Sequence, residues 1–312
     1  MINLNSKIYI AGHNGLVGSA ILRKLKQKGY KNIIYCDRKS LDLTNQLSVY
    51  KFLKKNKPKF IFICAAKVGG ILANQRFKAD FITQNILIQT NLINGAFLAG
   101  VKDLIFLGSS CVYPKNCKQP IKESYLLSGK LEETNDAYAI AKIAGLKMCE
   151  SFNEQYKLNY KCLMPTNTFG PKDNYDSINS HFIPALIKKV HNLKVSGKNE
   201  IRIWGDGKPK REVIYVDDIA DACIFFMKKK TKHFIINIGT GRDYSINYYV
   251  NLITKLILNR KIKIKYDKSK PRGVNRKVMD VSLAKKYGWK SKIKLNQSII
   301  ETYKSFKKEN VN

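Results

Sequence analysis

The chain contains 312 residues, of which 44% are hydrophobic and 11% aromatic. This is enough apolar material for one large domain or two closely packed domains, and it excludes general disorder. The longest apolar run, residues 60–66, has the length of a buried strand and is too short to span a membrane. Because no signal-peptide pattern opens the chain, we expect a cytoplasmic protein with no membrane partner.

The cysteine content argues against cross-linking. There are seven cysteines, an odd number, and they lack the spacing of paired metal ligands. Most of them lie in apolar runs. We therefore expect reduced thiols, and we predict neither a disulfide framework nor a zinc or other metal site.

The net charge is +34, because 57 residues are Lys or Arg and only 23 are Asp or Glu. Such a charge is typical of proteins that bind nucleic acid or an anionic membrane. Only nine of the 57 are arginines, however, and the lysines lack interleaved aromatic residues suited to base stacking. We interpret the charge as a solvated lysine-rich surface that also favours an anionic small substrate, and we predict no nucleic-acid partner. A true preference for polyanions is the alternative.

The first half of the chain alternates between two periodicities. Short apolar runs predict strands at residues 7–12, 32–36, 60–64, 104–107 and 161–164, and helical patterns separate them at 19–29, 47–55, 79–98 and 138–155. Strands that alternate with helices in this way are typical of an α/β fold with a doubly wound, Rossmann-like parallel sheet.

After residue 165 the alternation becomes irregular. We expect a loop at 167–180, helices at 181–191, 217–227 and 245–258, and strands at 201–204 and 261–266. These elements predict a smaller α/β lobe that binds the substrate. We place the dinucleotide-binding domain at residues 1–166 plus about 213–242, and the lobe at 167–212 plus about 243–312.

A glycine-rich turn follows the first predicted strand and opens the first helix. Its glycines, Gly12, Gly15 and Gly18, would let the backbone approach a pyrophosphate, whose charge a helix N-terminus favours. A tight turn without any ligand is the alternative. The second strand ends at Asp37 and Arg38. An acidic residue there favours NAD and an arginine favours NADP, so these residues leave the coenzyme open.

Tyr138 and Lys142 lie four residues apart on one predicted helix and therefore share a face. A lysine ammonium beside a phenol favours the phenolate, which would lower the pKa of the tyrosine toward neutrality. Such a tyrosine can pass a proton to a carbonyl oxygen. Together with Ser109, which follows the fourth strand, the pair forms a short-chain dehydrogenase constellation and not an ordinary surface pair.

Cys111 and His181 are further candidates. A thiol beside the serine is not needed for hydride transfer, but it could act as an acid or base toward a carbon next to a ketone. If His181 shared the pocket, the two would form a proton relay. The alternatives are a small buried hydrophobic residue for Cys111 and a structural role for His181.

The combined motifs resemble the GDP-L-fucose synthase family, which consists of extended short-chain dehydrogenases/reductases. The resemblance runs from about residue 7 to 289. It is carried by Gly12-His-Asn-Gly-Leu-Val-Gly18, Ala65-Ala-Lys-Val-Gly-Gly70, Gly108-Ser-Ser-Cys-Val-Tyr-Pro114, Tyr138-Ala-Ile-Ala-Lys-Ile-Ala-Gly145 and Met164-Pro-Thr-Asn167.

The family epimerises C3″ and C5″ of a GDP-4-keto-6-deoxy-mannose and then reduces its C4″ ketone with NADPH. The resemblance implies that Tyr138 protonates the C4″ oxygen, that Lys142 holds the nicotinamide ribose, and that Ser109 hydrogen-bonds the ketone. It implies that Cys111 and His181 exchange the protons at the carbons beside the ketone. It also implies a homodimer.

The resemblance further implies two sets of binding residues. Those for the substrate are Asn167, Lys189, Trp204 and Arg211, although a core position is the alternative for Trp204. Those for the coenzyme are Gly12, Asn14, Gly15, Leu16, Val17, Gly18, Arg38, Ala65, Leu107, Gly108, Lys142, Pro165, Asn167 and Thr168.

Three positions depart from the family pattern. Asn14 and Lys189 stand where arginines are common, and residues 270–273 read Lys-Pro-Arg-Gly where the family commonly has Lys-Pro-Asp-Gly. Asn14 together with Asp37 weakens the preference for NADP, but Arg38 keeps NADP the expected coenzyme, with NAD possible. The Lys-Pro-Arg-Gly segment leaves the identity of the sugar open. One alternative is a C4″ reductase of a GDP-4-keto-heptose (GDP-6-deoxy or GDP-glycero-heptose) in surface polysaccharide biosynthesis. A non-catalytic binding module is another.

Overall fold

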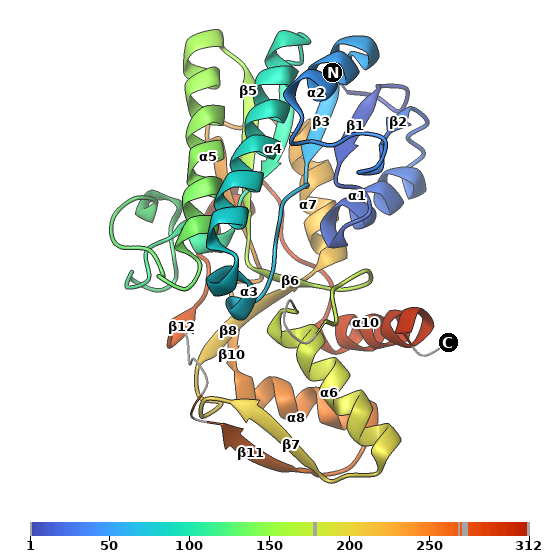
Figure 1. Cartoon of the computed structure of the whole chain (residues 1–312), viewed down its shortest axis with the longest axis vertical. Helices are drawn as coiled ribbons and strands as arrows, with labels where there is room; N and C mark the ends of the chain where they lie inside the picture. Colours follow the sequence, from blue (N-terminus) through green and yellow to red (C-terminus); the bar gives the residue numbers. More distant parts are fainter. Residues whose placement is uncertain (1, 177–179, 268, 270–273, 311–312) are drawn as a thin grey trace.

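A computed structural model describes residues 2–176, 180–267, 269 and 274–310. Its larger part is built on one sheet, and a smaller lobe lies against one end of that sheet (Figure 1). All pairings in the sheet are parallel, with the order β2-β1-β3-β4-β5-β9. Its strands are β1 (Ile8–Ala11), β2 (Ile33–Ile34), β3 (Phe60–Ile63), β4 (Asp103–Leu107), β5 (Asn159–Pro165) and β9 (Ile235–Ile238).

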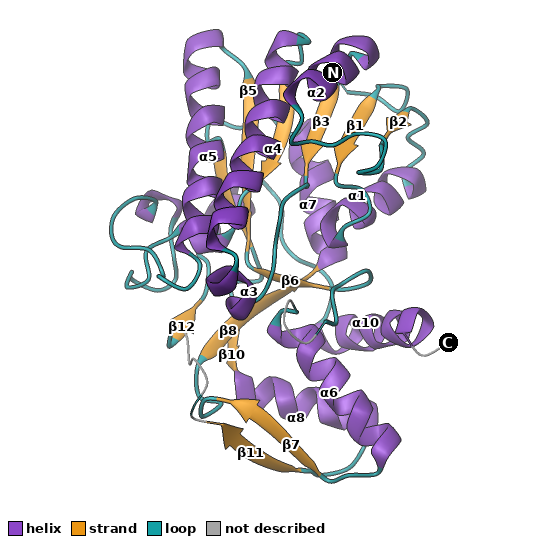
Figure 2. Cartoon of the chain, viewed as in Figure 1, coloured by secondary structure: helices purple, strands orange, loops and turns teal. Residues whose placement is uncertain are grey.

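Helices cover both faces of this sheet (Figure 2). One face packs against α1 (Leu16–Gln27) and α7 (Val216–Lys228), and the other against α2 (Gln46–Asn56), α4 (Lys78–Leu98) and α5 (Asp136–Tyr156). The short α3 (Ile71–Arg76) leads into α4. The prediction of a doubly wound parallel sheet is confirmed.

The strand order places a switch point between β1 and β3. The chain leaves β1 toward β2 on one side and returns to β3 on the other, so the turns after β1 and β3 diverge at the carboxyl edge of the sheet. Open α/β sheets bind their ligands in the crevice that such a divergence leaves. The glycine-rich turn after β1 lies at this position.

The lobe has its own hydrophobic core. In it β8 (Lys210–Tyr215) pairs with β6 (Asn167–Phe169), β10 (Asp243–Ser245) and β12 (Arg276–Lys277), and β7 (Glu200–Trp204) pairs with β11 (Lys263–Asp267). The lobe helices are α6 (Phe182–Ser196), α8 (Ile246–Leu258) and α10 (Leu295–Asn310), and α9 (Ser282–Lys286) packs on β9. The short helical turns η1 (Ser110–Val112) and η2 (Glu123–Tyr125) follow β4.

The loop predicted at residues 167–180 is wrong at its start. Residues 167–169 form β6, which pairs in parallel with residues 213–215 of β8. Sequence reasoning also missed β8, β9, β10, β12, α3, α9 and α10. Most of the missed strands are short, and several are rich in charged side chains. Their pairing partners lie far away in the sequence, so local periodicity did not reveal them.

The structure contains no helix that is both long and apolar enough to cross a membrane, as far as its described residues extend.

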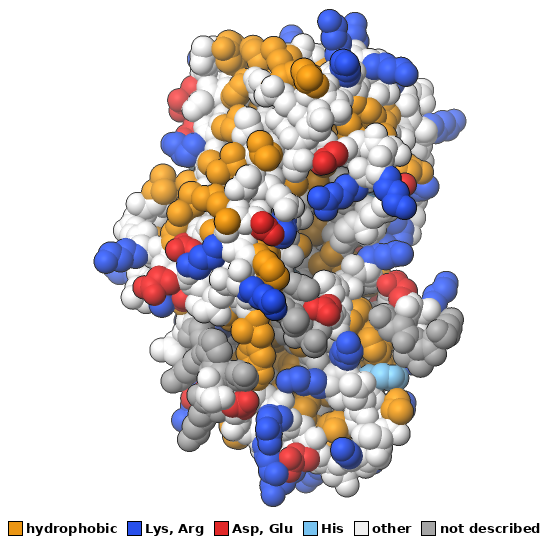
Figure 3. All heavy atoms as spheres, in the orientation of Figure 1, with side chains coloured by type: hydrophobic (Ala, Val, Ile, Leu, Met, Phe, Trp, Pro, Cys, Tyr) orange, Lys and Arg blue, Asp and Glu red, His pale blue; other side chains and the backbone are white. Residues whose placement is uncertain are grey.

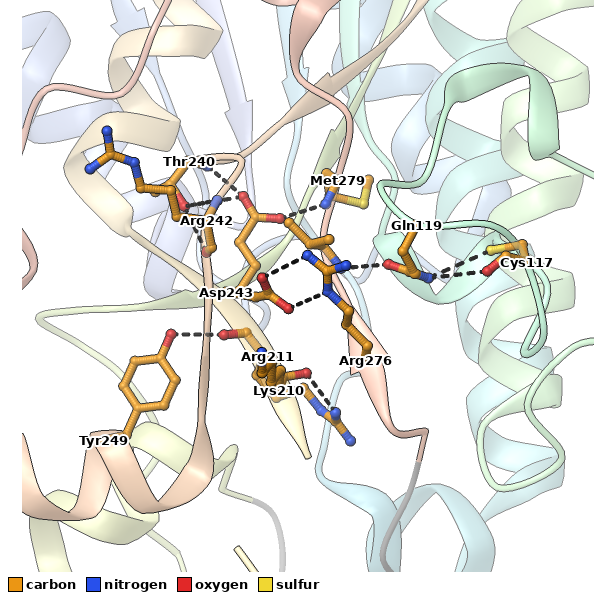
Figure 4. A network of polar contacts seen from close by, with 12 residues as sticks. Cys117, Gln119, Lys210, Arg211, Thr240, Arg242, Asp243, Tyr249, Arg276 and Met279 are labelled. Atoms are coloured by element: carbon orange, nitrogen blue, oxygen red, sulfur yellow. Dashed lines mark hydrogen bonds and ion pairs between the residues drawn. The ribbon is translucent and has the colours of Figure 1, made fainter. Parts of the chain in front are cut away.

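A buried carboxylate joins the lobe to the sheet. Glu212 of β8 is fully buried, and its carboxylate accepts hydrogen bonds from the backbone N–H groups of Thr240 (2.5 Å), Gly241 (2.7 Å) and Met279 (2.7 Å). Figure 4 shows Thr240 and Met279 on two sides of this network. Burial raises the pKa of Glu212, and these N–H groups oppose the shift. The Glu212 side chain thus connects three segments: β8 itself, the turn at residues 240–241 and the segment at Met279.

Replacing this carboxylate should destabilise the fold. Glu212→Ala leaves the buried N–H group of Met279 and the part-buried N–H groups of Thr240 and Gly241 without their acceptor. A buried group left unsatisfied costs about 1–3 kcal/mol, and the two part-buried groups add to this cost. We expect urea denaturation to show a free energy of unfolding lower by roughly 3 kcal/mol or more. Glu301→Ala, which breaks an exposed ion pair with Lys304, is the control and should change it by less than about 1 kcal/mol. Equal effects of the two variants would contradict the role of Glu212.

Candidate active site

A cleft of about 690 Å³ runs along the carboxyl edge of the sheet and continues onto the lobe. Each of the fourteen residues predicted to hold the coenzyme lines it. Ser109, Cys111, Tyr138, Lys142 and His181, predicted from distant parts of the sequence to be catalytic, line it as well. The structure therefore brings the two sets together, while the role of each residue stays a prediction.

The glycine-rich turn is shaped for close approach of another backbone. Gly12 has a φ of +87°, and a Cβ added to it would lie 2.7 Å from the Ala65 nitrogen. Gly15 donates its N–H to the Gly12 carbonyl at 3.2 Å and is the N-cap of α1. The first turn of α1 contains no acidic residue. This arrangement fits a dinucleotide pyrophosphate, because the helix N-terminus presents N–H groups and positive potential to the cleft.

The end of β2 presents both charges that bear on coenzyme choice. The Asn14 amide donates to the Asp37 carboxylate at 2.6 Å, and the ring of His13 lies 3.4 Å from the same oxygen. Asp37 therefore already has partners within the protein. Arg38 is exposed and lines the cleft, where a guanidinium suits a ribose 2′-phosphate.

Helix α5 carries Tyr138 and Lys142 on one face. The Lys142 ammonium donates to the Leu107 carbonyl at 2.8 Å and lies 5.9 Å from the centre of the Tyr138 ring. Tyr138 is hydrogen-bonded to Ser109, which caps η1 by accepting the Cys111 N–H at 3.2 Å. Packing of α5 on β4 thus brings the predicted Ser–Tyr–Lys set together.

The expected pKa of Tyr138 is wrong in direction. Burial raises it above the ordinary 10, the nearby Cys111 adds to the rise, and the Ser109 hydrogen bond only partly opposes it. Burial also lowers the pKa of Lys142 to about 8. The phenol is therefore protonated at neutral pH and can act as a proton donor. The lysine charge by itself would lower the pKa of the phenol, but the cost of burying a phenolate is larger.

Cys111 lies among nitrogen donors that sequence reasoning missed. The Asn135 amide nitrogen is 3.3 Å from its Sγ, and the Lys277 ammonium is 3.9 Å from it. Asn135, Lys277 and Glu132 also line the cleft. Asn135 precedes α5 and could have been noticed beside Tyr138, but Lys277 is 166 residues from Cys111, and only the pairing of β12 with β8 explains its place.

The lobe contributes His181 and Arg211. His181 is the N-cap of α6, with its ring open to the cleft but surrounded by enough protein for desolvation to lower its pKa below the ordinary 6.5. It is therefore neutral at pH 7. Arg211 lines the cleft from β8, where burial lowers its pKa and Glu132 opposes the shift.

Two predicted substrate residues are not part of the cleft wall. The Lys189 ammonium donates to the Arg202 carbonyl at 2.9 Å, and burial lowers the pKa of Lys189 while Asp267 opposes the shift. Trp204 is exposed at the end of β7, which excludes the alternative of a core aromatic. Both belong to the lobe, Lys189 on α6 and Trp204 on β7, and their binding of substrate stays a prediction. The Lys-Pro-Arg-Gly segment at 270–273 lies outside the described residues.

A dinucleotide turn, a Ser–Tyr–Lys set and a separate lobe over the carboxyl edge define a nucleotide-dependent oxidoreductase of the short-chain class. Residues 8–239 match the family described as the NAD dependent epimerase/dehydratase family. The chain belongs to this family.

Within this family, the chain is similar in sequence and structure to several enzymes that act on GDP-sugars. GDP-L-fucose synthase 1 of Arabidopsis thaliana is 46% identical over 303 residues, covering 97% of this chain and 94% of that protein. GDP-L-fucose synthase of Escherichia coli (strain K12) is 43% identical over 309 residues, or 96% of each chain. The structure of GDP-mannoheptose C4 reductase from Campylobacter jejuni with NADP bound is similar at a TM-score of 0.89 and 38% identity, covering 98% of this chain and all of the other.

The buried ammonium of Lys142 should make stability depend on pH. Its pKa is about 8 in the folded chain and 10.5 ordinarily, so the charge destabilises the fold below pH 8 and has no effect above 10.5. Lys142→Met removes that charge. We expect the variant to be more stable than the wild type at pH 7.5, by roughly 2 kcal/mol, and the difference to shrink as the pH rises toward 10.

Urea denaturation at several pH values measures this difference. Lys51→Met, at an exposed lysine on α2, is the matched control and should show no such trend. A Lys142→Met variant that is less stable than the wild type throughout this pH range would contradict the account.

Proposed function

We propose that this protein is an NADPH-dependent GDP-4-keto-sugar 3,5-epimerase/4-reductase that makes GDP-L-fucose or a close relative. The observation that carries the proposal is the convergence of Ser109, Cys111, Tyr138, Lys142 and His181 on one cleft with the dinucleotide turn. The identity of 43–46% with GDP-L-fucose synthases over nearly the whole chain supports it.

The reduction uses the buried end of the cleft. When bound, NADPH supplies the hydride for the C4″ ketone. The protonated Tyr138 phenol donates a proton to the C4″ oxygen, and Ser109 donates a hydrogen bond that polarises it. The Lys142 ammonium, held by the Leu107 carbonyl, binds the nicotinamide ribose and stabilises the phenolate left after proton transfer.

The epimerisation uses the same ketone before it is reduced. A carbonyl acidifies the C–H bonds on both sides, so a base can remove a proton from C3″ or C5″ and an acid can return one to the opposite face. Cys111 and the neutral His181 both have chemistry suited to this exchange, and they line the cleft from the sheet and from the lobe respectively. Arg211, which lines the cleft, binds the diphosphate together with Lys189 of the lobe.

A second function has its own support. The chain is 38% identical to a GDP-mannoheptose C4 reductase over nearly its whole length, so a C4″ reductase of a GDP-4-keto-heptose would suit the same cleft. Such an enzyme would reduce the ketone without epimerising its neighbours.

Turnover assays separate the two functions. With NADPH and enzymatically made GDP-4-keto-6-deoxy-mannose, we expect loss of absorbance near 340 nm and GDP-L-fucose as the product. An unepimerised product, or turnover only with a heptose substrate, would transfer the assignment to the C4″ reductase. No turnover with either substrate would contradict both functions.

Variants separate the two chemical steps. Tyr138→Phe should lose reduction by about 10²–10⁴-fold, because the phenolic proton is removed, while Cys111 still exchanges substrate protons with solvent. Cys111→Ser should show the reverse pattern. Its substrate should take up little deuterium from heavy water, while the enzyme keeps Tyr138 as the proton donor for reduction. Cys149→Ser, at a buried cysteine of α5 outside the cleft, is the matched control. Wild-type reduction by Tyr138→Phe would remove the tyrosine from the mechanism.

We also propose a cytoplasmic homodimer formed through α4 and α5. These adjacent helices carry Leu87, Leu98, Ile140 and Tyr156 with 41–61% of their surface exposed, an apolar face that a second copy would bury. Figure 3 shows apolar side chains gathered over this part of the molecule.

Changing this face should yield monomers. Leu87→Glu combined with Leu98→Glu places two charges in the proposed interface, so sedimentation should shift from dimer to monomer. Val195→Glu, at an exposed residue of α6, should leave the dimer intact. A wild-type protein that sediments as a monomer would contradict the interface.

A further inference from the structure

The structure has a second cavity, separate from the active-site cleft. It has a volume of about 880 Å³, within the range of roughly 300–1,000 Å³ usual for ligand pockets. Its walls come from β8, β10, the 239–242 turn, the start of α8 and the 289–296 segment that enters α10. It shares no lining residue with the cleft. No step of the proposed reaction uses it.

The cavity is lined by one sign of charge. Arg242, Lys285, Lys290, Lys292 and Lys294 belong to its wall, and the described residues that line it include neither Asp nor Glu. Lysines are common throughout this chain, so their number alone would be unremarkable. The distinguishing feature is that these cations surround a concave space with no carboxylate among its described lining residues. The Asp221 carboxylate, which is outside that lining, lies 3.9 Å from the Lys292 ammonium and offsets part of its charge, and the other cations leave the space with a positive potential.

Hydrogen bonds to α7 fix the segment at residues 289–296, which carries three of these lysines. Asp218, a buried residue of α7, accepts the backbone N–H groups of Lys292 (3.1 Å) and Ile293 (3.2 Å). The buried Trp289 donates its indole N–H to Asp221 at 3.3 Å. The backbone is therefore fixed while the side chains of Lys290, Lys292 and Lys294 remain exposed. A fixed backbone lowers the entropy that ordering these cations around an anion would cost.

Aromatic surface lies beside the cations. The rings of Tyr244 and Tyr248 stack with centroids 4.3 Å apart and planes 16° from parallel, and both line the cavity. Tyr248 is 41% exposed, so part of its surface is open to a ligand. A flat base stacks on such a ring, and an arginine such as Arg242 can add a cation–π contact. The Arg242 side chain extends away from Asp243 and Arg276 in Figure 4.

We infer that this second cavity is a nucleotide-binding site, distinct from the active-site cleft. The phosphates of the nucleotide lie against Lys290, Lys292 and Lys294, and its base lies against Tyr248. One hydrogen bond connects the cavity with the cleft. Thr240, which lines the cavity, donates its N–H to Glu212, and Glu212 is the neighbour of Arg211 in β8.

The test is the binding stoichiometry of GDP on the full chain saturated with NADP⁺, measured by isothermal titration calorimetry near 0.15 M salt. We expect two GDP molecules per chain. Lys290→Gln/Lys292→Gln/Lys294→Gln should remove one of them or weaken it at least tenfold. Lys54→Gln/Lys55→Gln/Lys57→Gln, with the same charge change around the end of α2, should leave both. Arg211→Gln should weaken only the molecule in the cleft.

The outcomes separate this site from the proposed reaction. If the proposed reaction is incorrect but the cavity binds a nucleotide, the wild type still binds one GDP molecule. The triple lysine variant of the cavity then abolishes this binding, and Arg211→Gln leaves it unchanged. If wild type binds a single GDP that Arg211→Gln abolishes, the cavity site is refuted. Tyr248→Ala should weaken GDP but not inorganic pyrophosphate, and equal effects on both would refute the base contact. Binding of polyuridylic acid at the cavity lysines, with no second GDP, would likewise overturn the inference.

Discussion

The buried carboxylate of Glu212 is the interaction on which the arrangement of the site depends. Its three backbone hydrogen bonds hold the turn after β9 and the segment after β12 against β8. The carbonyl of the same residue accepts the Asn167 amide at 2.8 Å, which fixes the start of β6 in the cleft. A lobe built from short strands is thereby joined to a rigid sheet, and Arg211 is placed opposite the residues of α5.

The chemistry depends equally on the packing of α5 against β4. Gly145 permits this contact, because a Cβ there would meet the Phe106 ring 2.7 Å away. The close approach buries the Lys142 ammonium beside the Leu107 carbonyl and 4.6 Å from the centre of the Phe106 ring. Burial is costly for a cation, and here it places the charge beside the phenol that we propose as the proton donor. The fold is less stable for it, and the proposed donor is held in place.

Sequence alone predicted five of the six strands of the sheet, because most of them are contiguous apolar runs buried on both faces, as β3 and β4 show. It placed the glycine-rich turn and Ser109 in the cleft from the strands that they follow, and the other predicted cleft residues came mainly from the resemblance to a known family. It missed β8, which begins Lys-Arg-Glu and whose partners are distant in sequence, and it therefore missed Lys277 beside Cys111. The direction of the Tyr138 pKa was likewise beyond it, since desolvation depends on packing that no local pattern encodes.

The central claim is that one cleft performs both proton exchange and ketone reduction. The most direct test is a single turnover of GDP-4-keto-6-deoxy-mannose with NADPH in heavy water, with the product analysed by NMR. We expect GDP-L-fucose that carries deuterium at both C3″ and C5″. A reduced product without deuterium at these carbons would contradict it and would identify a reductase that leaves epimerisation to another enzyme.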